Sequence, residues 1–235
     1  MNRNLSSVPA LARGLDILQW VVLASDAVTL TQIAQGTGLK VSEVQRPVGC
    51  LLQRGYLTRT AAGAYVISGK LFRLAATHPP FQQILRVAQP LMAEFAQEIG
   101  QTVHLCVPDG DAAMVIADAP GGGLVRISLQ VGARLNAEST VSGRLLWAAG
   151  VLEKPNKPVE ALAKRLLKIA EQGFERAQSE HAEGIVDTGV VIRGADGIVV
   201  AALTTSELRL LVNQVKKGDL LTALRSKAEL IGAGL

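Results

Sequence analysis

The sequence has few aromatic and few cysteine residues, and each shortage excludes a class of protein. Aromatic side chains make up 3% of the 235 residues, so the core must consist mainly of Leu, Val, Ile and Ala. The two cysteines, Cys50 and Cys106, match no zinc or redox spacing. Both lie in apolar contexts, and we expect both to be buried thiols in a reducing cytoplasm.

Long apolar runs are also missing. No stretch approaches the roughly 18 apolar residues that a bilayer-spanning helix needs. The first residues, MNRNLSSVPALARG, hold no apolar segment of signal-peptide length. We therefore expect a cytoplasmic protein that does not contact membranes.

The residue groupings of common active sites are absent as well. His78, His104 and His181 are scattered, and none has a partner at metal-ligand spacing. The three glycines at 121–123 match neither a P-loop nor a dinucleotide-binding fingerprint. His104 and Cys106 share one face of an expected strand, which is only a weak catalytic pairing. We predict that the chain is not an enzyme and holds no metal or cofactor.

What the sequence does have is positive charge concentrated in its first third. Residues 1–75 hold eight Lys/Arg against three Asp/Glu, a net charge of +5, whereas residues 76–235 hold 16 basic and 17 acidic side chains. This asymmetry favours a polyanionic partner for the first third. The alternative is a chance excess of charge on a solvated surface.

Residues 29–60, TLTQIAQGTGLKVSEVQRPVGCLLQRGYLTRT, read as a helix, a turn and a second helix. Thr29 and Gln32 have capping-box spacing, and Gly38 suits a left-handed turn. The second helix should begin near Ser42, a good N-cap. A preceding helix, PALARGLDILQWVVLA, places four apolar residues at helical spacing on what we expect to be its inner face: Leu11, Leu15, Leu18 and Val22.

The helix from Ser42 has the two faces of a recognition helix. At 100° per residue, its inner face carries Val44, Val48 and Leu51, and its outer face carries Ser42, Gln45, Arg46 and Gly49. Arginine pairs with guanine and glutamine with adenine in the major groove. Pro47 removes one helical hydrogen bond at a cost of about 3 kcal/mol, so we expect a loose or kinked first turn.

Two β-prone runs, GYLTRT and AYVISG, follow around a glycine turn and predict a hairpin, which at this place would be a wing. Arg59 at its edge is either a phosphate contact or a solvated turn charge. The chain 1–78 is thus predicted to be a winged helix-turn-helix DNA-binding domain. His78-Pro79-Pro80 then marks a linker, because paired prolines do not continue a helix.

Residues 79–235 are predicted to form a second domain with a linker helix over 81–99 that stops at Gly100. Hairpin signals lie at Asp109-Gly110-Asp111 and at Ala195-Asp196-Gly197, and LVRISLQ adds a strand. Further helices are expected at Val141–Ala149, Val159–Gln172 and about Leu208–Leu230. Paired strands apart from helices predict a fold of the α/β (α+β) class with an antiparallel sheet, covered by helices on one face and hollowed on the other.

Several segments resemble, in order and over nearly the whole chain, the IclR family of bacterial transcriptional regulators. They are ALARGLDILQWV, residues 29–60, ILRVAQPLMAEFAQEIGQTVHLCVPDGDAAMVIAD, VGARLNAESTVSGRLLWA, EQGF and GADGIVVAALTTS. The resemblance implies a DNA-binding domain, a connecting helix and a GAF-like effector-binding domain. It also implies dimers or tetramers on a pseudo-palindromic double-stranded DNA operator, with a small catabolic metabolite as effector.

The polar side of the second helix and the hairpin edge supply the expected DNA contacts, with Ser42, Gln45 and Arg46 on bases and Lys40 and Arg59 on phosphates. The resemblance implies the effector-binding residues. Effector contacts would fall on Val141, Ser142, Asp187, Thr204 and Ser206, while an acidic family position falls on Ala177. The ordinary alternative is that Thr140 and Ser142 cap a helix and that Thr204 and Ser206 end a strand. The chain departs from the family pattern at Asn136, Glu138 and Arg144.

Asp187 is unusual for such a pocket, because an enclosed carboxylate is costly unless it is paired or protonated. We hypothesise that the effector carries a hydroxyl, an amine or a cation near Asp187, or that Arg144 neutralises the charge. The predicted function is a ligand-responsive transcriptional regulator. The alternative, favoured by Pro47 and the modest charge, is a ligand- or protein-sensing module with degenerate DNA binding.

Overall fold

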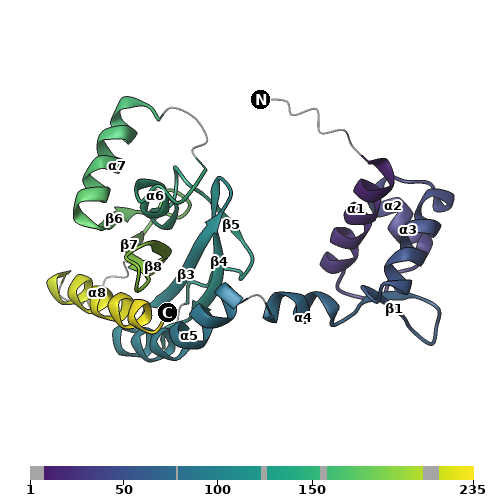
Figure 1. Cartoon of the computed structure of the whole chain (residues 1–235), viewed down its shortest axis with the longest axis horizontal. Helices are drawn as coiled ribbons and strands as arrows, with labels where there is room; N and C mark the ends of the chain where they lie inside the picture. Colours follow the sequence, from purple (N-terminus) through teal and green to yellow (C-terminus); the bar gives the residue numbers. More distant parts are fainter. Residues whose placement is uncertain (1–7, 78, 123–125, 154–157, 209–216) are drawn as a thin grey trace. The chain divides into compact units, whose positions relative to one another are not determined.

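The computed structural model describes residues 8–77, 79–122, 126–153, 158–208 and 217–235. The chain divides into two compact units, residues 1–78 and 79–235 (Figure 1). The first unit is mainly helical and the second is built around an antiparallel sheet, so the predicted mixed class is confirmed. No helix within the described residues is long and apolar enough to cross a membrane.

The first unit consists of three helices and a β-hairpin, followed by a fourth, short helix. Its elements are α1 (Pro9–Leu23), α2 (Leu30–Thr37), α3 (Val41–Gln53), β1 (Leu57–Arg59), β2 (Tyr65–Ile67) and α4 (Lys70–Ala76). Strands β1 and β2 pair antiparallel, as expected for a wing. The core joins all three helices to the hairpin through Ile17, Val21, Ile33, Val44, Val48 and Leu57.

The turn between α2 and α3 forms as the sequence predicts. The Thr29 N–H donates to Gln32 Oε1 at 2.8 Å, and the Gln32 N–H donates to Thr29 Oγ1 at 3.3 Å, which confirms the capping box. Gly38 ends α2 with a φ of 68°, a conformation that a side chain would disfavour.

Helix α3 begins two residues earlier than expected and is continuous. Its N-cap is Lys40, whose N–H donates to the Glu43 carboxylate at 3.0 Å, so Ser42 is not the cap. The helix runs without interruption through Pro47, and the expected loose first turn is not seen. Because Val44 and Val48 on either side of the proline are buried, packing offsets the lost hydrogen bond.

Two expectations for buried residues in this unit are wrong. On α1 the residues Leu11 and Leu15 are 61% and 49% exposed, and Ile17 and Val21 are buried instead. Apolar residues occur on two sides of this helix, so spacing alone did not identify the inner side. Cys50 is exposed, because it lies on the outer side of α3 beside Gly49.

The second unit is a six-stranded antiparallel sheet between helices. Its helices are α5 (Pro79–Ile99), α6 (Val141–Ala148), α7 (Glu160–Gln172) and α8 (Lys217–Ala233). Its strands are β3 (Thr102–Asp109), β4 (Ala112–Ala119), β5 (Arg134–Asn136), β6 (Phe174–Gln178), β7 (Ile185–Arg193) and β8 (Val199–Leu208), in the order β5-β4-β3-β8-β7-β6. Both predicted hairpins, β3–β4 and β7–β8, are confirmed.

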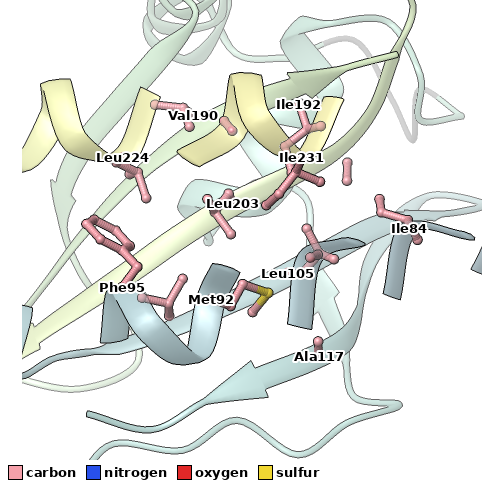
Figure 2. Close-up of a cluster of buried hydrophobic side chains, with 14 of the residues drawn as sticks. Ile84, Met92, Phe95, Leu105, Ala117, Val190, Ile192, Leu203, Leu224 and Ile231 are labelled. Carbon is pink, nitrogen blue, oxygen red and sulfur yellow. The ribbon is translucent and has the colours of Figure 1, made fainter. Parts of the chain in front are cut away.

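Alternate residues of the central strands pack into two hydrophobic cores, one on each face of the sheet. Leu105 and Leu203 face α5 and α8, where they pack with Met92, Phe95 and Leu224 (Figure 2). Their neighbours in sequence face α6, where the core contains Cys106, Ala202, Leu145, Leu146 and Trp147. Helices therefore cover both faces of the sheet, with α7 packed on α6, and the expectation of helices on one face is wrong.

Three further element predictions need correction. Residues 126–130 of the LVRISLQ segment are not a strand, and the sheet ends instead with β5, which the sequence did not indicate; residues 124 and 125 lie outside the described part. Leu208 ends β8, and the last described helix begins at Lys217. Helix α5 begins at Pro79 and not at residue 81, so Pro79 and Pro80 open this helix and are not a linker before it. Residues 209–216 and His78 lie outside the described part.

Gly189 allows α6 to lie close against the sheet. A Cβ atom built on Gly189 would come within 2.7 Å of Leu145 Cδ1 and of Thr204 Oγ1, and within 2.9 Å of Val141 Cγ1. Gly189 therefore sets the distance between β7 and the first turns of α6, where the candidate effector residues lie.

We expect Gly189→Ala to destabilise the second unit by about 1–3 kcal/mol, the usual cost of overpacking. The matched control is Gly49→Ala in α3, where nothing lies within 4 Å of the added Cβ. That variant should gain about 0.5–1 kcal/mol, since glycine disfavours helix. Urea unfolding of the three proteins tests this; equal stabilities would show that the close approach at Gly189 is unimportant.

Candidate functional site

The outer side of α3 is polar and exposed. Ser42, Gln45, Arg46 and Gly49 are exposed, while Val44 and Val48 are buried beneath them. Because Glu43 caps the helix, the Ser42 hydroxyl is not needed for capping. A Cβ atom on Gly49 would have no neighbour within 4 Å, so a close surface of a partner could approach the backbone there.

Arg59 lies at the edge of the hairpin and is partly held by it. Its Nε donates to the Gly63 carbonyl at 3.0 Å, and its guanidinium lies over the Tyr65 ring at 5.6 Å. The side chain is still exposed, so its terminal nitrogens are positioned toward solvent. Lys40, at the start of α3, is exposed as well. The structure thus presents cations on α3 and the hairpin.

The second candidate site is a cavity of about 200 Å³ on the α6 side of the sheet. The strand register places polar residues on the floor of the cavity in two rows. In the first row, His104 on β3 pairs with Thr204 on β8, which pairs in turn with Gly189 on β7. In the second row, Ser206 on β8 pairs with Asp187 on β7. Its walls come from the start of α6, from residues 127–135 and from the segment between β6 and β7. The lining residues are His104, Ile127, Leu129, Leu135, Thr140, Val141, Ser142, Ser179, His181, Ala182, Ile185, Asp187, Thr204 and Ser206.

The structure therefore brings together all five effector residues suggested by the family resemblance, and adds two histidines. His104 and His181 carried no effector signal in the sequence. The sequence pattern that could have indicated His104 is a polar residue that alternates with apolar residues along a strand. His181 lies in an irregular segment, where no sequence pattern indicates a role. Ala177, the replaced acidic position, does not line the cavity.

Ser142 connects α6 to the cavity floor. Its hydroxyl lies 3.2 Å from His104 Nε2 and 2.9 Å from Thr204 Oγ1. Thr140, not Ser142, caps the helix, since Thr140 Oγ1 accepts from the Gly143 N–H at 3.1 Å. Burial lowers the pKa of His104 to about 4, so this imidazole is neutral at physiological pH. Burial likewise raises the pKa of the nearby Cys106 thiol to about 12, which makes it a poor nucleophile.

Asp187 is the one carboxylate on the cavity wall. Its Oδ1 accepts a hydrogen bond from the Ser206 hydroxyl at 2.6 Å. Burial raises the pKa of this carboxyl group, while the Ser206 hydrogen bond and the charges of Arg144 and His181 act in the opposite direction. Asp187 is therefore a hydrogen-bonding group whose charge is disfavoured in the folded protein.

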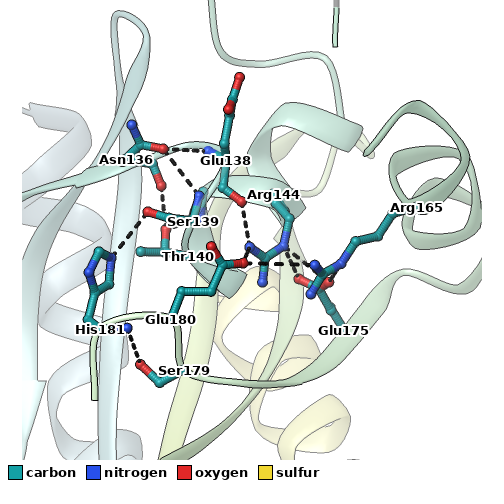
Figure 3. A network of polar contacts seen from close by, with 11 residues as sticks. Asn136, Glu138, Ser139, Thr140, Arg144, Arg165, Glu175, Ser179, Glu180 and His181 are labelled. Atoms are coloured by element: carbon teal, nitrogen blue, oxygen red, sulfur yellow. Dashed lines mark hydrogen bonds and ion pairs between the residues drawn. The ribbon is translucent and has the colours of Figure 1, made fainter. Parts of the chain in front are cut away.

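A buried ion-pair network holds one wall of the cavity in place (Figure 3). Arg144 on α6 is 1% exposed, and its Nε donates to both oxygens of Glu175 on β6 at 2.9 and 3.1 Å. Its NH1 donates to the Glu138 carbonyl at 2.5 Å and to Glu180 at 3.1 Å. Arg165 of α7 reaches the same Glu175. The network ties the segment after β6 to α6.

Further hydrogen bonds beside the cavity hold the segment between β6 and β7. His181 Nε2 lies 3.2 Å from Ser139 Oγ, and the His181 N–H donates to Ser179 Oγ at 3.3 Å. Asn136 Oδ1 in turn accepts from the N–H groups of Glu138 and Ser139. Three of the positions that depart from the pattern of the resembled family, Asn136, Glu138 and Arg144, thus belong to one connected network. Within the described residues no group of three His, Cys, Asp or Glu side chains is arranged to hold a metal.

Comparison with known proteins identifies similar chains. The family model for the bacterial transcriptional regulator IclR C-terminal region matches residues 81–233, and the IclR helix-turn-helix domain matches residues 10–61. The transcriptional repressor IclR of Escherichia coli K12 is 25% identical over 198 residues, which is 76% of this chain and 72% of that protein. The Pca regulon regulatory protein of Pseudomonas putida is 26% identical over 214 residues, 84% of this chain and 73% of that protein.

Solved structures show the same arrangement of elements. The crystal structure of an IclR homolog from Microbacterium hydrocarbonoxydans, complexed with 4-hydroxybenzoate, has a TM-score of 0.80 to this chain at 25% identity. The match covers 96% of this chain and 98% of that one.

The pKa of His104 gives a prediction for acid stability. Because the folded pKa, about 4, lies below the ordinary value of 6.5, the unfolded chain binds more protons between these values, and stability falls as pH drops through this window. The loss from this group should be on the order of 3 kcal/mol. His104→Gln, which does not titrate, should lose that part of the dependence in urea unfolding at pH 7 to 4. His181→Gln should retain it; an unchanged slope in His104→Gln would contradict the assignment.

The buried network gives a prediction for stability. Arg144→Met leaves the Glu175 carboxylate buried with Arg165 alone and should cost about 3–5 kcal/mol. The same substitution at Arg134, which makes exposed ion pairs to Asp109 and Asp111, should cost about 0–1 kcal/mol. Thermal or urea unfolding measures the loss of stability in both variants. Similar losses would show that burial does not make the Arg144 ion pair contribute more than an exposed one.

Proposed function

The chain belongs to the IclR family of bacterial transcriptional regulators, and on that premise we propose how it recognises DNA and effector. Residues 1–78 act as the DNA-binding domain and residues 79–235 as the effector-binding domain. The protein acts in the cytoplasm as a homodimer or tetramer on a pseudo-palindromic operator. It performs no catalysis.

The polar side of α3 reads base edges in the major groove. Gln45 and Arg46 pair with bases, each contributing about 1–3 kcal/mol of discrimination, and Ser42 contacts the same groove. Lys40 and Arg59 contact phosphates, which fix the position of the helix without reading sequence. The supporting observation is that α3 is continuous through Pro47 and exposes these residues over a buried apolar side.

The effector occupies the cavity between α6 and the sheet, where Val141, Ser142, Asp187, Thr204 and Ser206 contact it. A volume of about 200 Å³ lies below the roughly 300–1,000 Å³ of typical ligand pockets, so the effector is a small metabolite. The ring-sized ligand of the Microbacterium homolog is consistent with that size. To regulate, the effector must bind the DNA-competent and DNA-incompetent states with different affinities.

The test is selection of duplexes from a random pool at low ionic strength, followed by affinity measurements on the selected duplex. We expect Arg46→Gln to lose about 1–3 kcal/mol and to relax specificity at one position. Lys40→Gln should weaken binding to all duplexes and lower the salt dependence by about one phosphate contact.

Lys168→Gln is the matched control, because Lys168 is an exposed cation on α7 in the other unit; its affinity should equal that of the wild type. If the wild-type protein enriches no sequence, DNA reading is wrong, and the chain is instead a ligand- or protein-sensing module that has lost DNA recognition.

A further inference from the structure

Asp187 is the acidic group among the described residues that line the cavity, and the positive charges that act on it come from Arg144 outside the lining and from His181 within it. Among the described residues that line the cavity there is no Lys or Arg, and Asp187 is the one carboxylate. Its single hydrogen-bond donor is the Ser206 hydroxyl. A carboxyl group has about four acceptor positions, so Asp187 has acceptor capacity left for a ligand.

Arg144, the arginine that could balance Asp187, is bound to other acceptors through Nε and Nη1. Its guanidinium donates to both oxygens of Glu175, to Glu180 and to the Glu138 carbonyl. It acts on Asp187 only through space, and its own charge is matched by the two glutamates. The carboxyl group of Asp187 is therefore open to a hydrogen-bond donor that enters the cavity.

We propose that the effector presents an uncharged or cationic hydrogen-bond donor to Asp187 and that this residue excludes anionic ligands. The inference rests on the proposed effector site. A donor on the ligand is accepted in either ionisation state, because a carboxylate and the carbonyl oxygen of a carboxylic acid both accept hydrogen bonds. Exclusion of anions belongs to the ionised form, in which the carboxylate repels an anion placed in so small a cavity.

The rest of the cavity limits the body of the ligand. Ser142 and Thr204 already hydrogen-bond to each other. Six apolar side chains line the walls: Ile127, Leu129, Leu135, Val141, Ala182 and Ile185. Burying apolar ligand surface there is favourable. One polar atom remains unsatisfied, since His104 Nδ1 has no hydrogen-bond partner among the described residues. The ligand class is thus a small amide, amine or alcohol with an apolar body.

The start of α6 does not reverse this preference. A helix N-terminus attracts anions through its unpaired N–H groups, but Thr140 Oγ1 already accepts from the Gly143 N–H. The remaining attraction of the α6 N-terminus for an anion corresponds to a partial positive charge. The Asp187 carboxylate, when ionised, carries a full negative charge. Charge exclusion by Asp187 therefore outweighs the helix.

Three probes of nearly equal shape separate these possibilities: benzamidine is cationic, benzamide is neutral and carries a donor, and benzoate is anionic. Binding to the full-length protein is measured by titration calorimetry and by the shift in melting temperature. We expect benzamidine and benzamide to bind at least about tenfold more tightly than benzoate, a difference of about 1.4 kcal/mol.

Asp187→Asn, which keeps the shape and removes the charge, should reduce this preference mainly by improving benzoate binding. Asp187→Ser serves as a second variant should the first not fold. Asp196→Asn is the control, because Asp196 lines a different cavity beside Phe81 and Ile84 and should leave the preference unchanged.

Benzoate binding equal to or tighter than benzamide binding in the wild type would overturn the proposal. The same holds for an unchanged preference in both Asp187 variants, and for a wild type that binds none of the three probes at millimolar concentration. These results are independent of duplex selection. If the protein selects duplexes but binds no probe, DNA recognition is retained and this inference is rejected. If probe binding depends on charge but no duplex is selected, this inference is retained and DNA recognition is rejected.

Discussion

The ion pair between Arg144 and Glu175 is the constraint on which the second unit's site depends. Both groups are almost completely buried, at 1% and 6% exposure, and a buried charge is tolerated only when it is paired and hydrogen-bonded. Arg144 and Glu175 therefore depend on the elements that supply their contacts, which are α6, β6, α7 and the segment after β6. That segment carries Ser179, His181 and Ala182, which close one wall of the cavity. The cavity exists in this form because the charges beneath it are satisfied.

The sheet register explains why these particular polar residues meet. In an antiparallel sheet alternate residues face the same side, so His104, Thr204 and Ser206 turn toward α6 while Leu105 and Leu203 turn toward α5 and α8. The pairing of Asp187 with Ser206 then fixes the hydrogen bond that positions the carboxyl group. Gly189 completes the arrangement, since its missing side chain lets Val141 and Leu145 approach the strand. One shift of register would turn the whole polar group into the opposite core.

The two units divide the chemistry of a regulator between them. The first exposes flexible cations and amides over a small apolar core, a surface suited to a charged and extended partner. The second encloses a mostly apolar cavity with one acid and a few hydroxyl groups, a surface suited to a small molecule. Capping by Glu43 and packing of Val44 and Val48 keep α3 continuous despite Pro47, so the proline leaves the exposed polar side of this helix in place.

The sequence by itself determined the local elements whose causes lie within a few residues. The capping box at Thr29 and Gln32, the left-handed turn at Gly38, the two-faced helix around Val44 and Val48, and the hairpins at Gly110 and Gly197 all follow from neighbouring side chains and backbone preferences. Tertiary structure decided what depends on distant partners. It buried Ile17 and Val21 in place of Leu11 and Leu15, left Cys50 exposed, made β5 and not 126–130 the edge strand, and placed α6 on the second face of the sheet. It also paired Arg144 with Glu175 and brought His104 and His181 to the cavity, because burial and charge satisfaction are set by residues far apart in the chain, where no local pattern records them.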